Sequence, residues 1–478
     1  MIFSRLIKDS AVYGMADVLT KIISFFTFPI IAAALSPKAF GAMELIVTVT
    51  ALLGLVMNCG LNNAVQRFYW DKDTTASMRP TIVTSGLYAQ VGLGLLALLG
   101  GSVVIPFALP LIQSEAWPLS WIGLVAALLV MTFSQWVQYA VDVIRLHFKP
   151  WRFFMLAVVS RVATMILGIV AVVVLGLGVD GLLAAQALVL ALALPLAVWL
   201  IRKDCKPRLF SKLWMKELIR FGYPFIFAGL AYWLFGAMDR WMLASMKTVD
   251  EVGVYSVAFR FASIVLFVSA AFGQAWSPNA MKIRTDHPEH YRVIYGQVLL
   301  VLLFGMLVVG GAMALFSGEV IGLFMPQDYH ASAMPLAILC FGIIIQSSQQ
   351  VTAAGISIAK KTYLFARIAW LTAAVNFGAN LVLIPTYGAL GAAWATLISY
   401  LLLSGAYLYW SQRLHPIRVQ WGRLITLLLL GAVVATASLL FISLEVDGPI
   451  LLFKLLLSIS CLYLGLKILP LKSVRGLN

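Results

Sequence analysis

Residues 180–201 read DGLLAAQALVLALALPLAVWLI, and residues 202–220 read RKDCKPRLFSKLWMKELIR. The first stretch has 22 residues with one charge, Asp180 at its start. About 20 mostly apolar residues are enough to cross the hydrocarbon core of a bilayer as a helix. The second stretch carries seven Lys and Arg residues. An apolar run followed by such a basic segment predicts a transmembrane helix that ends on the cytoplasmic side.

The same alternation runs through all 478 residues of the chain. Hydrophobic residues make up 62% of it and charged residues 11%, whereas a soluble globular chain carries about 25% charged residues. The net charge of +15 is divided among the segments between apolar runs. This distribution indicates membrane topology rather than a nucleic-acid surface. We therefore predict an all-α polytopic membrane protein.

The length of a membrane-spanning helix divides the chain into about fourteen predicted spans. They cover residues 11–35, 41–64, 81–105, 120–144, 153–175, 180–201, 219–243, 253–276, 293–315, 334–358, 363–384, 388–410, 422–443 and 449–469. With the N-terminus inside, the cytoplasmic segments hold 27 of the 34 Lys and Arg residues, and the outer loops hold only Lys38 and Lys247. Both termini are therefore predicted to be cytoplasmic.

A weak internal repeat recurs at a spacing of about 211 residues. The turn Ser36–Gly41 returns at Thr248–Gly253, and Lys149 before the fifth span returns as Lys360 before the eleventh. Six predicted helices separate the copies, so both copies have the same orientation in the membrane. We predict two six-helix bundles related by a pseudo-two-fold axis near the membrane normal, with two additional helices after them. The corresponding domains are residues 1–208, 209–414 and 415–478.

The basic segment between the two bundles has an amphipathic second half. Residues 209–220 alternate apolar side chains such as Leu213 and Trp214 with Lys212, Lys216 and Arg220. This pattern predicts a helix on the inner leaflet that contacts anionic headgroups. A plain linker between the bundles is the alternative.

Three local stretches carry a resemblance to a known family. They are Gly60–Tyr69 (GLNNAVQRFY), the pair Asp239-Arg240, and Val252–Tyr255 (VGVY). With the arrangement of six, six and two helices, the chain resembles the polysaccharide flippases, O-antigen type, of the multidrug/oligosaccharidyl-lipid/polysaccharide superfamily. The resemblance implies movement of an undecaprenyl-pyrophosphate-linked oligosaccharide from the inner to the outer leaflet by alternating access. It also implies that the first, second, seventh and eighth helices line the cavity.

Charged side chains within the predicted spans mark candidate sites, because a charge at mid-membrane costs at least about 2.5–3.5 kcal/mol. Asp17 and Lys21 lie four residues apart on the first span. They form either a neutral pair or a cavity cation with a neighbouring carboxylate. Glu44 and Asn62 bound a face of small and polar residues that we predict to be one continuous helix face. In the repeat register this face returns on the eighth span, where it includes Arg260.

A flippase for a pyrophosphate-linked lipid needs cations that face its cavity, because a diphosphate cannot cross hydrocarbon unpaired. Lys21, Arg161 and Arg260 are the candidates. Arg161 could instead extend to the inner headgroups, and Arg260 could instead form a structural bridge to Glu44. With the amides of the two polar faces, the predicted substrate-binding residues are Lys21, Arg260, Arg161, Asn58, Asn62 and Gln274.

The predicted coupling or gating residues are Asp17, Glu44, Asp239 and Arg240. A proton gradient, a sodium gradient or the membrane potential would supply the driving force, since the sequence holds no GxxxxGK[ST] loop for a nucleotide. Asp239 and Arg240 fall near the outer end of the seventh span, where a gate bridge is the hypothesis. The four cysteines are far apart, so we predict no disulfide framework, no metal site and no cofactor.

Two later spans add polar side chains to the predicted interior. Gln138, Asp142 and Arg145 follow one face of the fourth span, and Asn376 and Asn380 share a face of the eleventh. We expect the amides to form interhelical hydrogen bonds, and sugar binding is the alternative.

Three other functions fit parts of this pattern. An exporter of cationic drugs would need an acidic or apolar cavity, and a peptidoglycan-precursor flippase would carry arginines in the first two helices, where this chain has Lys21 and Glu44. A membrane enzyme would need a large outer loop with catalytic groups. His147 and His415 fall in inside loops, where we expect them to be solvated. The expected location is the bacterial cytoplasmic membrane, with lipids and possible glycan polymerase or glycosyltransferase partners.

Overall fold

The computed structural model describes residues 19–112, 120–147, 149–359, 361, 363–445 and 447–469. Within these ranges the chain is helical apart from short connections and contains no strand. Eleven of the described helices are long and apolar enough to cross a membrane, and a bent pair over Lys212–Ala231 and Trp233–Met246 brings the number to twelve. The chain is a multi-pass membrane protein, and the predicted all-α polytopic fold is confirmed.

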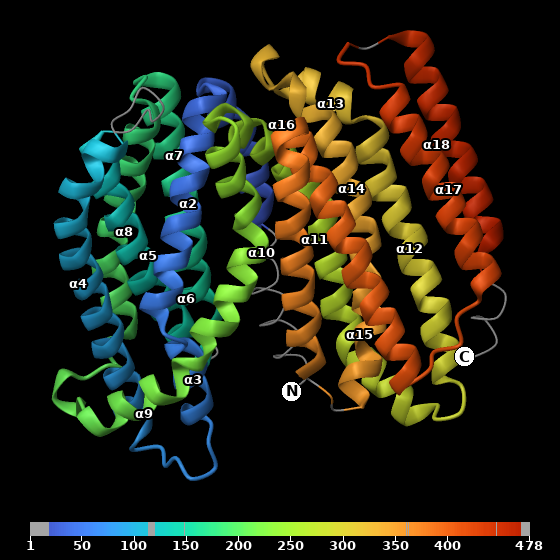
Figure 1. The fold of residues 1–478 in the computed structure, drawn as a ribbon. Coiled ribbons are helices and arrows are strands. Elements are labelled where there is room, and N and C mark those ends of the chain that lie inside the picture. Colours follow the sequence, from blue (N-terminus) through green and yellow to red (C-terminus); the bar gives the residue numbers. More distant parts are fainter. Residues whose placement is uncertain are drawn as a thin grey trace. The chain divides into compact units, whose positions relative to one another are not determined.

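The chain divides into two compact units, and the division falls inside a helix (Figure 1). Unit 1 is Met1–Ala237 and unit 2 is Met238–Asn478. The helices of unit 1 are an apolar helix over Leu19–Ala34, α2 (Pro37–Asn58), α3 (Leu61–Tyr69), α4 (Arg79–Ile112), α5 (Trp121–Leu146), α6 (Pro150–Phe154), α7 (Ser160–Ile169), α8 (Gly178–Ile201), α9 (Lys212–Gly222) and the first part of α10 (Pro224–Met246). The predicted domain boundaries, residues 1–208 and 209–414, concern membrane topology and stay a prediction.

Unit 2 begins in the last part of α10. Its further helices are α11 (Val249–Asp286), α12 (Tyr291–Leu315), α13 (Ser317–Phe324), α14 (Ala333–Ser347), α15 (Gln349–Ile358), α16 (Tyr363–Leu414), α17 (Trp421–Leu440) and α18 (Gly448–Ile468). Helices α11, α12, α14 and α16 pack on one another and form its core, while α17 and α18 pack against α12. All fourteen predicted spans overlap a described helix of one of the two units.

The eleventh and twelfth predicted spans form one helical run, α16, that breaks at Gly388. This glycine has φ 56° and ψ −131°, a conformation that side chains with a Cβ rarely adopt. Pro385 one turn earlier removes a backbone donor. The backbone N–H of Ala389 donates to Glu251 Oε2 at 2.7 Å. Glu251 at the start of α11 therefore caps the second part of α16.

The second predicted span continues to Tyr69 but is interrupted between α2 and α3, so the predicted continuous helix face from Glu44 to Asn62 is wrong. Helix α2 stops at Asn58, and both Cys59 and Gly60 adopt left-handed backbone conformations before α3 begins. A Cβ on Gly60 would press into the backbone carbonyl of Gly222 at the end of α9. This close backbone approach sets the break, and it places Asn62 on a different helix from Glu44.

Helix α9 confirms the expected amphipathic helix, and contact of its apolar side with the inner leaflet stays a prediction. It lies across one end of unit 1 (Figure 1) and packs on α3 and α4. Leu218 is fully buried there, and Trp214 contacts the ring of Phe68 edge-on. The apolar side is therefore only partly covered by protein, since Leu213 is 70% exposed, and Lys216 and Arg220 are exposed as well. Contact of these cations with anionic headgroups stays a prediction.

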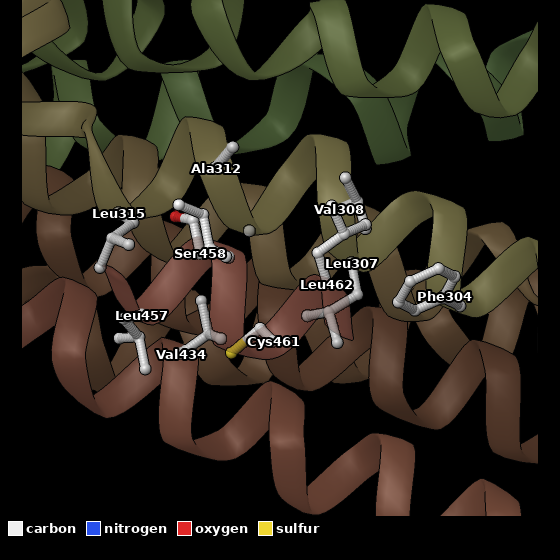
Figure 2. Close-up of a pocket in the computed structure, with 12 residues that line it drawn as sticks. Phe304, Leu307, Val308, Ala312, Leu315, Val434, Leu457, Ser458, Cys461 and Leu462 are labelled. Carbon is white, nitrogen blue, oxygen red and sulfur yellow. The ribbon is translucent and has the colours of Figure 1, made fainter. Parts of the chain in front are cut away.

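Two contacts attach the peripheral helix α18 to the rest of unit 2. Lys454 is fully buried and its Nζ lies 2.5 Å from Glu319 Oε1 on α13, while Gly465 packs against the ring of Phe304 on α12. Between these two points lies an apolar pocket of about 180 Å³ that α12, α17 and α18 line, with Ser458 and its neighbours pointing into it (Figure 2). The rest of α18 is poorly buried, so the ion pair is its main polar attachment.

Replacing Gly388 by Ala should lower the thermal stability of the purified protein. The alanine would occupy an unfavourable backbone conformation, and its Cβ would lie 2.8 Å from the Glu251 carboxylate. Gly405→Ala in the same helix is the matched control, since a Cβ there meets nothing within 4 Å. Thermal unfolding in detergent measures both. Equal unfolding temperatures of the two variants would contradict this account of the break.

Lys454→Met should destabilise the protein by about 3–5 kcal/mol, because it leaves the Glu319 carboxylate buried without its cation. The double variant Lys454→Met/Glu319→Leu should be closer to wild type than Lys454→Met alone, since it removes both charges. Lys467→Met, at an exposed position of the same helix, is the control and should be near neutral. Chemical or thermal unfolding measures all three. A double variant that is no more stable than Lys454→Met alone would refute the pair as a coupled unit.

Candidate coupling site and substrate cations

Asp239, in the part of α10 that belongs to unit 2, is a buried carboxylate within the seventh predicted span. Its side chain is 5% exposed. Asn380 Nδ2 donates to Oδ1 at 2.7 Å, and Tyr255 OH and Thr396 Oγ1 donate to Oδ2 at 2.7 and 3.0 Å. Among the described residues, all the groups that donate to this carboxylate are neutral. Helices α10, α11 and α16 are thereby joined through one carboxylate.

Further polar atoms surround this carboxylate. Asn380 also donates to Asn376 Oδ1 at 3.1 Å, and the carbonyl oxygen Asn380 Oδ1 is buried with no hydrogen-bond partner. The expected interhelical hydrogen bonding is confirmed for Asn380. A carboxylate with amide and hydroxyl oxygens around it is the donor set that hard cations prefer. We call Asp239, Tyr255, Asn376, Asn380 and Thr396 the Asp239 cluster.

The side chain of Arg240 contacts residues other than the adjacent Asp239. Its Nε donates to Ser256 Oγ at 3.1 Å, and its guanidinium lies 5.0 Å from the centre of the Phe259 ring. Arg240 is 7% exposed, so its charge is stabilised by a hydroxyl and by aromatic faces. The divergence of the two side chains agrees with their positions about 100° apart on a helix. The gate bridge stays a prediction.

The predicted substrate cations of unit 1 lie on neighbouring helices. Lys21 is exposed on the helix Leu19–Ala34, and Arg161 is exposed on α7. Arg161 Nη2 lies 3.5 Å from Ser24 Oγ, one turn after Lys21 on the same helix. The structure therefore brings these two helices together at the level of both cations. Asp17 lies outside the described residues.

The other predicted site residues fall in different places. Glu44 is buried on α2 and Asn58 is half-buried at its end, while on α11 Arg260 is half-buried and Gln274 is exposed. Glu44 belongs to unit 1 and Arg260 to unit 2, and the bridge between them stays a prediction. Asn62 lines a polar pocket of about 330 Å³ inside unit 1.

We expected two histidines to be solvated, but both contact other side chains. His147 Nε2 lies 3.1 Å from Asp204 Oδ1 and 3.2 Å from Tyr69 OH, which joins three segments of unit 1. In unit 2, His415 stacks on Tyr291, and burial together with nearby arginines lowers the pKa of His415. The sequence prediction failed because the partners are distant along the chain.

Cys205, the residue after Asp204, has a thiol that does not ionise readily. Burial, and to a smaller extent the Asp204 charge, raises the pKa of the Cys205 thiol to about 12. The thiol is therefore neutral at physiological pH and behaves as a small packing residue.

Sequence reasoning missed Tyr255 and Thr396 as hydrogen-bond partners of Asp239. Tyr255 ends the VGVY stretch, and its position directly after the predicted outer turn was a usable signal for a buried polar contact. Thr396 carried no such signal, because a single threonine in an apolar span usually bonds to its own helix. Its sequence separation from Asp239 is 157 residues.

Comparison with known proteins gives a consistent result. The family described as polysaccharide biosynthesis protein matches residues 6–284, more than half of the chain. A succinoglycan biosynthesis transport protein of Rhizobium meliloti is 27% identical over 334 residues, 68% of this chain and 64% of that protein. A probable low-salt glycan biosynthesis flippase of Haloferax volcanii is 22% identical over 217 residues, 44% of each chain. The alignments thus span about half to two thirds of these relatives' own lengths.

Two solved structures share the fold. The lipid II flippase MurJ in an inward closed conformation superposes with a TM-score of 0.77 and 13% identity, over 97% of this chain and 100% of that one. An inward-facing multidrug resistance transporter of the MATE family gives a TM-score of 0.66 and 15% identity, over 82% and 94%. At these identities the likeness concerns the fold alone. It agrees with the predicted all-α polytopic membrane fold.

Asp239→Ala should destabilise the protein more than Asp250→Ala. The first change leaves the donors of Tyr255, Asn380 and Thr396 buried without their acceptor, at about 1–3 kcal/mol for each unsatisfied group. Asp250 is exposed in the first turn of α11 and serves as the control. Thermal unfolding of the purified protein is the measurement. Equal losses would show that the Asp239 cluster contributes nothing to the fold.

Proposed function

The chain belongs to the family of polysaccharide biosynthesis proteins, and on that premise we propose that it flips a lipid-linked oligosaccharide across the membrane. The substrate is of the undecaprenyl-pyrophosphate type, and it moves from the cytoplasmic to the outer leaflet for synthesis of a cell-surface polysaccharide. The relatives named as a glycan flippase and as a succinoglycan transport protein support this class of substrate. The chain acts as a transporter and not as an enzyme.

The observation that carries the proposal is the pair of exposed cations in the membrane-spanning part of unit 1. Lys21 and Arg161 lie on apolar helices that meet at Ser24. Charged side chains in such a place are costly and therefore mark candidate functional sites. A pyrophosphate is a suitable ligand for them, because guanidinium and ammonium groups form charge-assisted hydrogen bonds with phosphate oxygens. Arg260 on α11 of unit 2 is a further proposed phosphate contact.

The proposed cycle is alternating access in the bacterial cytoplasmic membrane, with both termini in the cytoplasm. The prenyl tail stays in lipid while the charged headgroup and the glycan move through protein. The concentration of 27 of the 34 Lys and Arg residues in alternate segments supports the orientation. A glycan polymerase or a glycosyltransferase is the expected partner on the synthesis pathway.

We assign coupling to the Asp239 cluster, which would bind a sodium ion or a proton. Its carboxylate is buried among neutral oxygen and nitrogen donors, and Asn380 Oδ1 is an unused acceptor beside it. An ion that binds there neutralises Asp239 and changes the hydrogen bonds between α10, α11 and α16. Such a change is a physical route from ion binding to helix movement.

An exporter of cationic drugs is the alternative function on this fold. The fold of the multidrug transporter supports it, but cations in unit 1 would repel a cationic drug. A peptidoglycan-precursor flippase is the closer alternative, and the identity of the accumulated lipid in the experiment below distinguishes it.

Cells depleted of this protein should accumulate the lipid-linked oligosaccharide in the inner leaflet. Wild-type protein should relieve the accumulation. Arg161→Ala or Arg260→Ala should relieve it at least tenfold less efficiently. A tenfold loss corresponds to about 1.4 kcal/mol of phosphate-binding free energy. Arg418→Ala, at an exposed position in a predicted cytoplasmic segment, is the matched control. Leaflet position is read by a membrane-impermeant reagent that modifies the glycan. Normal distribution without the protein, in a strain with no second flippase, would contradict the proposed function.

Asp239→Asn should abolish the response of the purified protein to its coupling ion. We expect sodium chloride, compared with choline chloride, to raise the unfolding temperature of wild type by mass action if sodium is the ion. If the proton is the ion, transport rather than stability should follow pH, and Asp239→Asn should remove that dependence. Asp250→Asn is the control and should respond as wild type does. An Asp239→Asn variant that keeps the ion response would exclude the Asp239 cluster from coupling.

A further inference from the structure

We infer that the polar pocket of unit 1 is a glycan-binding site. It has a volume of about 330 Å³ and lies between α3 and the last turns of α5. Ligand pockets for small molecules begin at about 300 Å³, so this one suits one or two sugar rings. The inference rests on the proposed function, since it names the part of the substrate that this unit recognises.

The pocket wall presents hydrogen-bonding groups of both kinds. Asn62, Asn63 and Gln66 come from α3, and Asp142 and Arg145 from α5. The amides both donate and accept, as sugar hydroxyls do. Asp142 Oδ1 accepts from Gln138 Nε2 at 3.0 Å, and a carboxylate can accept further hydrogen bonds from sugar hydroxyls. Such a wall can pair with a ring that carries several neighbouring hydroxyls.

One aromatic ring completes the recognition of a sugar. Trp70 follows α3, lines the pocket and is 48% exposed. The guanidinium of Arg79 lies 4.9 Å from the centre of the Trp70 ring, and Tyr69 contacts it edge-on at 5.0 Å. These contacts hold the indole in place. An exposed aromatic surface beside hydrogen-bonding groups fits a sugar, which has an apolar C–H face and a polar rim.

The charge of the lining selects against the other candidate ligands. Asp142 and Arg145 are of opposite sign, so the pocket lining carries no net charge from these two residues. A pyrophosphate would need uncompensated cations, and a cationic drug would need uncompensated carboxylates. A neutral or singly charged glycan needs neither. The pyrophosphate therefore binds elsewhere, at the cations of the proposed function, and this pocket binds the sugars.

The backbone of unit 1 gives the pocket a defined shape. The left-handed pair Cys59-Gly60 ends α2 and sets the direction of α3, along which the three amides follow. Tyr139 forms part of the wall, and its hydroxyl donates to the carbonyl of Val83 at 2.7 Å. By the predicted topology this end of unit 1 is cytoplasmic. The site would therefore meet the glycan on the side where it is assembled.

Saturation-transfer NMR on the full-length protein in lipid nanodiscs tests the inference. The probes are free glucose, galactose, rhamnose, N-acetylglucosamine and glucuronate. At least one should receive saturation from wild type, and Asn63→Ala and Asp142→Asn should weaken its binding about tenfold each, the effect of one lost hydrogen bond in a small ligand. Trp70→Ala should abolish it. Trp421→Ala and Asn279→Ala, exposed positions outside the pocket, are the matched controls and should bind as wild type does.

The same variants are then tested for relief of glycolipid accumulation in depleted cells. Loss of sugar binding together with poor relief by the Asn63→Ala/Asp142→Asn double variant supports the inference. It is overturned if no probe binds wild type and the double variant relieves accumulation fully, or if inorganic pyrophosphate displaces the sugar from this pocket. A depleted strain that accumulates no glycolipid refutes the proposed flipping. If sugar binding to wild type is nevertheless lost in the pocket variants, the glycan-binding site is supported independently of flipping. Unfolding temperatures show that each variant is folded.

Discussion

A polar group among hydrocarbon has no water to bond with, and the rest of this structure depends on that constraint. Asp239 is satisfied by a tyrosine, an asparagine and a threonine from two other helices. Lys454 is satisfied by Glu319, and this pair attaches an otherwise poorly buried helix. In both places a buried charge determines which helices meet. Substitutions that remove one partner should therefore affect helix packing as well as chemistry.

The two units satisfy the constraint in different ways, and the difference suggests a division of function. In unit 2 the Asp239 carboxylate is enclosed and bonded, as suits a site that binds and releases a small ion. In unit 1 Lys21 and Arg161 are exposed, and a separate pocket carries amides and an indole. We propose that unit 1 recognises the substrate headgroup while the Asp239 cluster couples its movement to an ion.

The helical membrane fold could be predicted from the sequence, because an apolar run of fixed length and the placement of Lys and Arg depend on local composition alone. The break after Asn58 was not predicted, although Gly60 is a local helix-stop signal, and the backbone contact of Gly60 with Gly222 could be found only in the folded protein. The predicted importance of Asp239 came from its charge within a span. Its partner Asn380 is 141 residues away and could be found only in the folded protein.

The central claim is that this chain alone moves a lipid-linked oligosaccharide between leaflets. The most direct test reconstitutes the purified protein in vesicles with a pyrophosphate-linked glycolipid and follows the glycan with an impermeant glycosidase. We expect glycolipid of the inner leaflet to become accessible in vesicles that contain the protein, and the protected half to persist in vesicles without it. Protection that persists equally in both, with protein that is folded, in the correct lipid and supplied with an ion gradient, would contradict the account.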